Sequence, residues 1–366
     1  MVGTDRSTGR AGLTPREQAV GTAFGLWMVI GLFLDGWAHD NDKPESFFTP
    51  WHGILYSGFT AAALAAVAVA FGRRRADRSW TATLPRGHGL TLVALVGFAA
   101  GAIGDLAWHE TLGVEVGVEA LLSPTHLLLL ASGLVALSAP LRSAWVEDDA
   151  RPDGLRDFAP VAVSTAILVS LVGFFLLYLS PFVNDAAGTR FDRVASEPHD
   201  HPSTEVGELQ QMLGIGSILM TTVLIVVPIA LLRRRWQPPM GSFALLLGIV
   251  ITLFVGLNEF AQPGLLPAGV FAGVAADLMV RNGHGRLAGV AATLTLWIAY
   301  FGLYQSTVDT VAWSAELWSG TIVLASLVAG AIGLLELPVP AHSRGARPAT
   351  QRAPDGAASQ ERNVLV

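Results

Sequence analysis

Long apolar segments constrain the fold of this chain more than any other feature of its sequence. Runs of roughly 17 to 25 mostly apolar residues recur along it, and about 20 residues of helix cross the hydrocarbon core of a bilayer. Lipid cannot pair with backbone N–H and C=O groups, so each run is expected to be helical. The sequence therefore predicts an all-α, polytopic transmembrane bundle of about ten helices. The predicted spans are 20–39, 50–72, 88–109, 121–141, 158–180, 207–232, 242–260, 264–280, 287–305 and 318–337.

Charged residues are too few for a protein whose whole surface faces water. Of 366 residues, 52% are hydrophobic and 14% are charged, whereas soluble domains carry about 25% charged residues. The chain has no cysteine, which excludes disulfides, thiolate metal sites and thiol nucleophiles. Lys43 is the only lysine among 23 basic residues, a usage typical of bacteria with GC-rich genomes.

The basic residues are concentrated in alternate gaps between the predicted spans. The N-terminal tail and every second gap after it hold all of them except Lys43, Arg190 and Arg193. Because Lys and Arg concentrate in cytoplasmic loops, we expect both termini in the cytoplasm and the chain in the plasma membrane. The predicted parts are a cytoplasmic tail at 1–19, a four-helix metal-binding part at 20–141, a six-helix membrane part at 142–337 and a disordered cytoplasmic tail at 338–366.

Polar residues gather where the first two predicted spans meet. Asp35 and His39 are four residues apart and therefore share one face of a helix. After a short acidic loop, Thr49 and Pro50 have the residue types of an N-cap and a first helical position. His52 then lies in the first turn of the second helix. The hairpin is predicted to bring Asp35, His39 and His52 to the same depth.

The next two spans repeat this arrangement. Asp105 and His109 close the third span, and Ser123-Pro124-Thr125-His126 opens the fourth. The shared pattern is Asp-x-x-x-His, a loop, and then Ser/Thr-Pro-x-His. Both copies lie on the side with few basic residues, which we expect to be extracytoplasmic.

Each copy offers one carboxylate and two imidazoles, a ligand set used by copper, iron or zinc. An ionisable group inside a membrane costs roughly 2.5–3.5 kcal/mol on insertion scales, so six near one level require a compensating partner. A bound cation would supply it. The predicted metal ligands are Asp35, His39, His52, Asp105, His109 and His126.

Residues 30–135 resemble the C subunit of the particulate methane and ammonia monooxygenases, the copper membrane monooxygenases. That subunit carries Asp-x-x-x-His and then a Phe-Thr-Pro-x-His segment, which Asp35, His39 and the segment 48–52 match in order and spacing. The family next has Asn-x-x-x-His and a Pro-x-His segment, where this chain has Asp105, His109 and His126. The match differs in three ways: Asp105 replaces an Asn, the second loop is longer, and an Arg-Asp pair before the first Phe-Thr-Pro is missing.

The resemblance implies copper as the cofactor and oxygen-dependent oxidation of a small apolar substrate within the bilayer. It also implies protein partners, either other monooxygenase-type subunits or further copies of this chain. No cupredoxin-like soluble domain is present in the sequence. A nucleic-acid partner is not expected.

Several polar residues outside the repeated motif are further candidates for ligands, proton carriers or ion pairs. We interpret Asp277 and Arg281, four residues apart, as an ion pair. Glu110, Glu115 and Glu119 are expected to be solvated, although Glu110 could accept a hydrogen bond from a ligand histidine. His199 and His201 could bind a metal, but this short motif in a loop is expected not to. The residues at the depth of the repeated motif that could act as extra ligands or proton carriers are Glu205, Glu208, Asn258 and Glu259.

Three other functions fit the same motif. The chain could be a metal transporter, chaperone or oxidase-assembly protein without catalysis of its own. It could hold haem between two histidines, or its Asp–His pairs could relay protons in a solute carrier. The six methionines are scattered rather than placed at helical spacing, which argues against a methionine-lined path for Cu(I).

Overall fold

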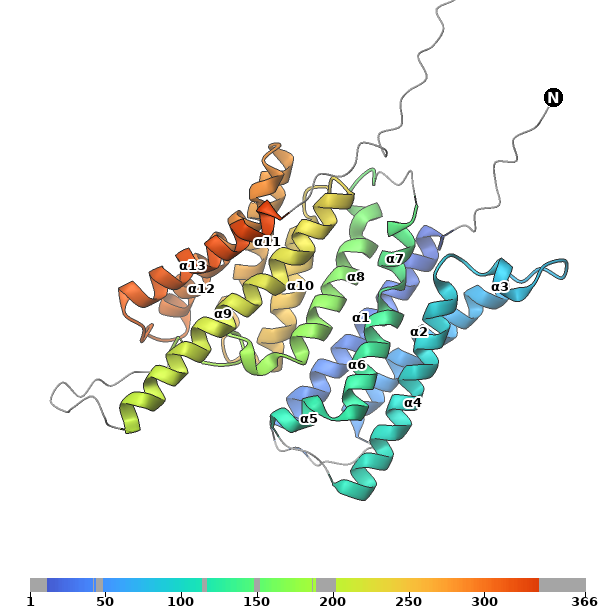
Figure 1. Cartoon of the computed structure of the whole chain (residues 1–366), viewed down its shortest axis with the longest axis horizontal. Coiled ribbons are helices and arrows are strands. Elements are labelled where there is room, and N and C mark those ends of the chain that lie inside the picture. Colours follow the sequence, from blue (N-terminus) through green and yellow to red (C-terminus); the bar gives the residue numbers. More distant parts are fainter. Residues whose placement is uncertain are drawn as a thin grey trace, which may run out of the picture. The chain divides into compact units, whose positions relative to one another are not determined.

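The computed structural model describes residues 12–41, 43, 49–113, 117–147, 152–185, 187–188 and 202–335, without the side chains of 40 and 202–206. Within these residues the chain forms thirteen α-helices and three short 3₁₀ helices, and no β-strand (Figure 1). Of the predicted tails, residues 1–11 of the first and all of the second, 338–366, lie outside the described residues. The α-helices are α1 (Pro15–Asp40), α2 (Pro50–Gly72), α3 (Trp80–Thr83), α4 (His88–Leu112), α5 (Val118–Leu122), α6 (Pro124–Leu137), α7 (Ala139–Trp145), α8 (Leu155–Phe174), α9 (Pro202–Arg235), α10 (Ser242–Leu257), α11 (Leu266–Arg281), α12 (Ala288–Thr307) and α13 (Ala315–Leu334). The 3₁₀ helices are η1 (Leu177–Leu179), η2 (Pro263–Leu265) and η3 (Gly285–Leu287).

The helices confirm an all-α, multi-pass membrane architecture. Eight helical segments are long and apolar enough to span a bilayer: α1, α2, α4, α8, α9, η2 with α11, η3 with α12, and α13. The pair α6 and α7 would make a ninth span if it crosses as one unit, and α10 is an apolar helix of 16 residues. Each of the ten predicted spans thus contains an apolar helix, while the count of ten crossings stays a prediction.

The fourth predicted span, 121–141, is not one continuous helix. Ser123 caps α6, and α6 and α7 meet at Ser138 with a bend of 43°. Pro140 lies in the first turn of α7, where proline is tolerated because the backbone N–H that it lacks would have no partner. Farther inside a continuous helix, proline would remove a hydrogen bond and clash with the preceding turn.

Three other boundaries also differ from the prediction. The first helix begins at Pro15 rather than residue 20, because Thr14 and Glu17 form a reciprocal capping box. In the fifth predicted span, α8 ends at Phe174 and is followed by η1, instead of continuing to residue 180. In the sixth predicted span, α9 begins at Pro202 rather than at residue 207.

Asp277 does not form the predicted ion pair with Arg281. Its carboxylate accepts hydrogen bonds from the backbone N–H groups of Gly241, Phe243 and Ala244, at 3.0, 3.1 and 3.2 Å. These are the unpaired N–H groups at the start of α10, so the buried carboxylate caps that helix.

Two helical hairpins, α1 with α2 and α4 with α6, pack side by side in one part of the bundle (Figure 1). Helices α9, α11, α12 and α13 form the other part, and α8 and α10 lie between the two. Phe33 of α1 contacts Phe174 of α8 and Phe254 of α10, with ring centroids 5.2 and 5.3 Å apart. This aromatic cluster fixes α1 against the rest of the core two residues before Asp35.

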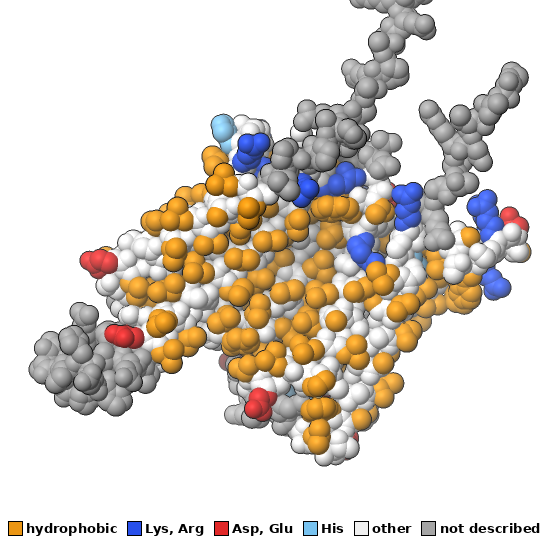
Figure 2. Space-filling view, viewed as in Figure 1, with side chains coloured by type: hydrophobic (Ala, Val, Ile, Leu, Met, Phe, Trp, Pro, Cys, Tyr) orange, Lys and Arg blue, Asp and Glu red, His pale blue; other side chains and the backbone are white. Residues whose placement is uncertain are grey.

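The surface matches a lipid environment. Figure 2 shows hydrophobic side chains over most of one face, with Lys and Arg along its upper edge and most Asp and Glu toward its lower edge. Large apolar side chains such as Val96 and Ile103 are 70% exposed. In water such exposure would be costly, whereas in lipid it requires no partner.

Helices α1 and α2 approach closely through glycine. A Cβ on Gly31 would lie 2.5 Å from the backbone N and Cα of Leu55, and one on Gly58 would lie 2.6 Å from the backbone N of Met28. Leu55 is three residues after His52, and Asp35 is four residues after Gly31. The close backbone contact between α1 and α2 therefore sets the distance between the side chains of Asp35 and His52.

Replacing Gly31 by alanine is expected to force α1 and α2 apart and to lower the unfolding free energy by about 1–3 kcal/mol. Gly302 is the matched control because it is also helical but has nothing within 4 Å of an added Cβ. Gly302→Ala should be neutral or slightly stabilising. Thermal unfolding of both variants in detergent measures the difference, and equal midpoints would contradict the close contact.

Candidate metal centres

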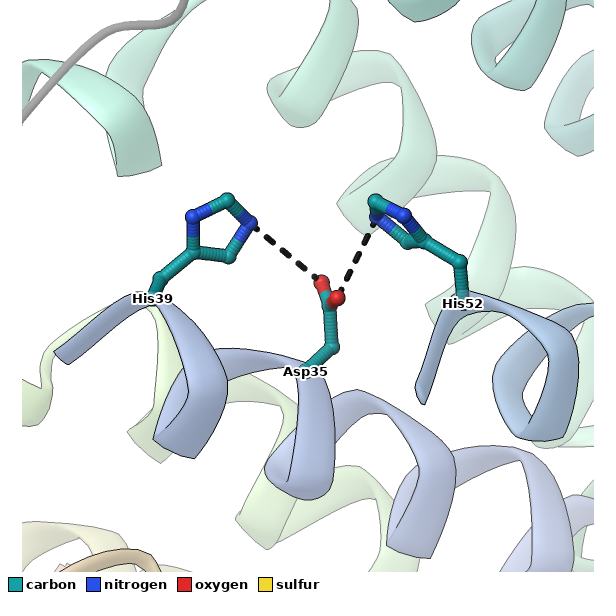
Figure 3. Close-up of side chains that lie close together, drawn as sticks. All are labelled: Asp35, His39 and His52. Carbon is teal, nitrogen blue, oxygen red and sulfur yellow. Dashed lines mark ion pairs between the residues drawn. The ribbon is translucent and has the colours of Figure 1, made fainter. Parts of the chain in front are cut away.

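The first candidate centre lies where α1 ends and α2 begins. The Nε2 atom of His52 is 3.2 Å from Oδ1 of Asp35, and Nε2 of His39 is 3.9 Å from Oδ2 of the same carboxylate. Figure 3 shows the carboxylate between the two imidazoles. One possible ligand atom from each of the three residues lies within 4.8 Å of the other two. The predicted convergence of this triplet is confirmed.

The second centre repeats this geometry on α4 and α6. The Nε2 atoms of His109 and His126 are 3.4 and 3.3 Å from the two carboxylate oxygens of Asp105. These three residues also place ligand atoms within 4.8 Å of one another. Asp105 is 3% exposed, so its carboxylate is almost completely removed from solvent.

In both triplets the nitrogen–oxygen distances are compatible with ligands of one metal ion. An ion of zinc's size binds imidazole nitrogen and carboxylate oxygen at about 2.0–2.2 Å, which places two ligands of a tetrahedral site roughly 3.4 Å apart. The nitrogen–oxygen distances of 3.2–3.9 Å agree with this value. Three protein ligands also leave a fourth position open for another molecule.

The helix-capping hydroxyl groups orient one imidazole in each centre. Thr49 Oγ1 accepts the backbone N–H of His52 and lies 3.1 Å from Nδ1 of the same residue. Ser123 Oγ accepts the backbone N–H of His126 and lies 2.8 Å from its Nδ1. When Nδ1 donates to the hydroxyl, Nε2 keeps its lone pair and faces the carboxylate. A hydrogen bond of this kind fixes the tautomer and orientation of a metal-binding histidine.

The carboxylates of the two centres have different surroundings. Thr125 Oγ1 donates to Oδ1 of Asp105 at 3.0 Å. Trp51 stands at the corresponding place in the first copy and has no hydroxyl group. Oδ1 of Asp35 is buried and accepts no hydrogen bond from the described residues apart from its contact with His52. A cation would compensate this buried oxygen.

The end of α1 is braced by the turn between α10 and α11. Trp37 Nε1 donates to Oε1 of Glu259 at 3.1 Å. Glu259 and Phe260 have φ values of 54° and 53°, which side-chain-bearing residues rarely adopt. Strained backbone of this kind persists only where its surroundings hold it, and here it meets the helix end that carries Asp35 and His39.

Both centres line one cavity of about 480 Å³. Helix α8 and the segment after it supply the far wall, mostly with apolar side chains that include Phe174, Phe175, Leu177 and Val183. Tyr56, one turn after His52, also lines the cavity, and its phenol lies within electrostatic reach of both Asp35 and Asp105. Tyr56 lies four residues after His52, a spacing that places both side chains on one helix face and could have predicted this position.

The other polar candidates do not join these centres. Glu110, Glu119 and Glu208 have exposed side chains. Glu115, His199 and His201 lie outside the described residues, as does the side chain of Glu205. Among the residues that the structure describes, only the two triplets bring three such ligands together.

Comparisons of the chain with protein-family models, curated proteins and solved structures found no match. The resemblance to the monooxygenase C subunit therefore stays a prediction based on the motif residues.

Replacing Ser123 by alanine is expected to weaken metal binding at the second centre by about 10–100-fold, because the hydroxyl group that orients His126 is lost. The same change removes a helix cap, which alone costs about 1 kcal/mol. Ser314→Ala is the matched control, since Ser314 caps α13 without contacting an imidazole. Competition with a metal chelator measures the affinities. Equal affinities in the two variants would show that the hydroxyl does not orient the ligand.

Proposed function

We propose that this protein is a copper-binding membrane oxidoreductase that uses oxygen to oxidise a small apolar substrate, alone or as one subunit of a larger enzyme. The observation that carries the proposal is the placement of two Asp/His/His triplets on one largely apolar cavity. A structural metal site needs no such cavity, whereas a catalytic site needs an open ligand position and room for a reactant.

The donor set favours copper among the metals that it could bind. Imidazole and carboxylate without thiolate suit copper, iron and zinc, and copper binds most tightly of the divalent first-row metals. The resemblance of residues 30–135 to a copper monooxygenase subunit points the same way. Iron and zinc are the alternatives that metal analysis distinguishes.

The chain's own residues would hold the metal, orient it and keep water away. Asp35, His39 and His52 would bind one ion, and the second triplet would bind another. When bound, copper supplies one-electron chemistry and activation of oxygen. The apolar walls from α8 exclude water and accept an uncharged substrate, and Tyr56 offers a phenol group near both triplets.

A non-catalytic transporter has less support. Transport of an ion would need polar ligands that continue through the bundle. Away from the triplets, the cavity walls are instead formed by side chains such as Met28, Leu32 and Phe98. Haem also fits poorly, because the Asp35 carboxylate lies between the imidazoles of His39 and His52, where the macrocycle would have to pass (Figure 3).

The metal assignment predicts that Asp35→Ala, His39→Ala and His109→Ala each lower the amount of bound metal, because each removes one of three ligands. His284→Ala is the control, since His284 is exposed and belongs to neither triplet. Elemental analysis of the purified proteins gives the identity and stoichiometry of the metal. Full stoichiometry in all three ligand variants would reject the assignment.

The catalytic assignment predicts oxygen consumption by copper-loaded protein in the presence of an electron donor and a small apolar substrate. The double variant Asp35→Ala/Asp105→Ala should lose this activity, because both centres lose their carboxylate. An oxygen electrode and chromatography of the product test the two halves of the reaction. Metal-dependent transport by proteoliposomes without oxidation would favour the non-catalytic alternative.

A further inference from the structure

The loop between α2 and α4, residues 73–87, concentrates basic side chains at one end of two membrane spans. It holds five arginines and a single acidic residue, Asp77. Two of the arginines have partners in the body of the protein: Arg73 pairs with Glu17, and Arg86 donates to a backbone oxygen just after α7. The other three are Arg74, Arg75 and Arg78. We refer to this segment as the α2–α4 loop.

The charges of these three arginines are not balanced by the protein. All three side chains are exposed, and the ion pairs among the described residues include none of them. The guanidinium of Arg74 lies over the ring of Trp80, 5.7 Å from its centroid, which orients the group without neutralising it. Asp77 offsets one charge, so the exposed part of the loop is positive and attracts anions.

An aromatic pair places this charge at the level of the membrane surface. The ring of Trp80, in α3, packs against Phe71 in the last turn of α2, with ring centroids 5.1 Å apart. Both residues remain exposed, at 44% and 53%, whereas Leu84 after α3 is buried and ties the loop to the bundle. Figure 2 shows basic side chains at this end of the molecule next to hydrophobic ones. Tryptophan concentrates where hydrocarbon meets headgroups, so the pair indicates a loop that lies along the membrane surface.

We propose that the α2–α4 loop binds the headgroups of anionic phospholipids through its three exposed arginines, with the rings of Phe71 and Trp80 against the adjoining acyl chains. Guanidinium groups suit phosphate, and each basic residue near an anionic bilayer strengthens the attraction by about fivefold. A soluble acidic partner would not need exposed apolar rings at the end of a span. The loop is independent of the metal centres, because His52 and His109 lie at the opposite ends of α2 and α4.

The test uses the absence of cysteine from the chain. Ser79→Cys introduces one thiol for an NBD fluorophore, at an exposed residue whose side chain makes no capping hydrogen bond. The labelled protein is placed in vesicles of phosphatidylcholine with phosphatidylglycerol as the minor lipid. In one sample the phosphatidylglycerol carries a quenching nitroxide, and in the other an equal amount of phosphatidylcholine carries it. Random mixing gives equal quenching, whereas we expect about two- to fivefold stronger quenching by phosphatidylglycerol.

Removing the charge should remove this preference. In the labelled protein, Arg74→Gln/Arg75→Gln/Arg78→Gln should be quenched equally by both lipids, and high salt should have the same effect on the unchanged loop because it screens the charges. The matched control is Arg234→Gln/Arg281→Gln/Arg286→Gln. It also removes three exposed arginines but leaves the loop intact, so the preference should persist. Asp35→Ala should keep the preference too, which separates this result from the test of the metal centres.

Removing the indole should lift the loop from the membrane. Trp80→Ala is expected to reduce quenching by both lipids, whereas Trp27→Ala, which removes a ring of similar exposure (43%) from α1, should not. The proposal is overturned if both lipids quench the unchanged loop equally, if the triple variant in the loop retains the preference, or if Trp80→Ala behaves like Trp27→Ala. An absence of quenching by either lipid would also overturn it and would favour a soluble acidic partner.

Discussion

Lipid offers neither hydrogen bonds nor solvation of charge, and this constraint explains most of what the structure does with its polar groups. The Asp277 carboxylate caps α10, and the Glu17–Arg73 ion pair anchors the start of α1. The six motif residues pair with one another in two triplets. A carboxylate that would be expensive alone becomes tolerable beside two imidazoles, and more so with a cation between them.

The sequence predicted what is determined within a few residues of the chain. Asp35 and His39 share a helix face because they are four residues apart. Thr49 and Pro50 start a helix whatever the orientation of that helix in the bundle. The hairpin then brings His52 back to the same level. These local rules, applied twice, were enough to predict both triplets, and their convergence in the structure follows from the same rules.

Features that depend on other helices were not predictable in this way. The carboxylate of Asp277 caps the N-terminus of α10, which lies 33 to 36 residues away in sequence. This distant partner replaces Arg281, the partner predicted from local spacing. The contribution of α8 to the cavity beside the two triplets likewise depends on packing through Phe33, Phe174 and Phe254. The resemblance to a known subunit covered only the first four predicted spans and gave no role to the later ones. In the structure, α8 and the segment up to Val183 close the cavity that the two hairpins open.

The two triplets share a pattern but are stabilised by different contacts, and this difference makes them chemically distinct. Asp105 receives a hydrogen bond from Thr125, which draws negative charge from one carboxylate oxygen and weakens it as a ligand. Asp35 lacks such a donor and keeps a buried oxygen whose only described contact is His52. Its helix end is held from outside by Trp37 and the strained turn at Glu259. The carboxylate of the second centre is already stabilised by a hydrogen bond, whereas that of the first centre is not. A cation would therefore stabilise the first centre more, and we expect the first centre to bind metal more tightly. With metal bound as proposed, two inequivalent centres on one cavity would allow one ion to remain bound while the other changes its ligands, which a pair of identical sites would not favour.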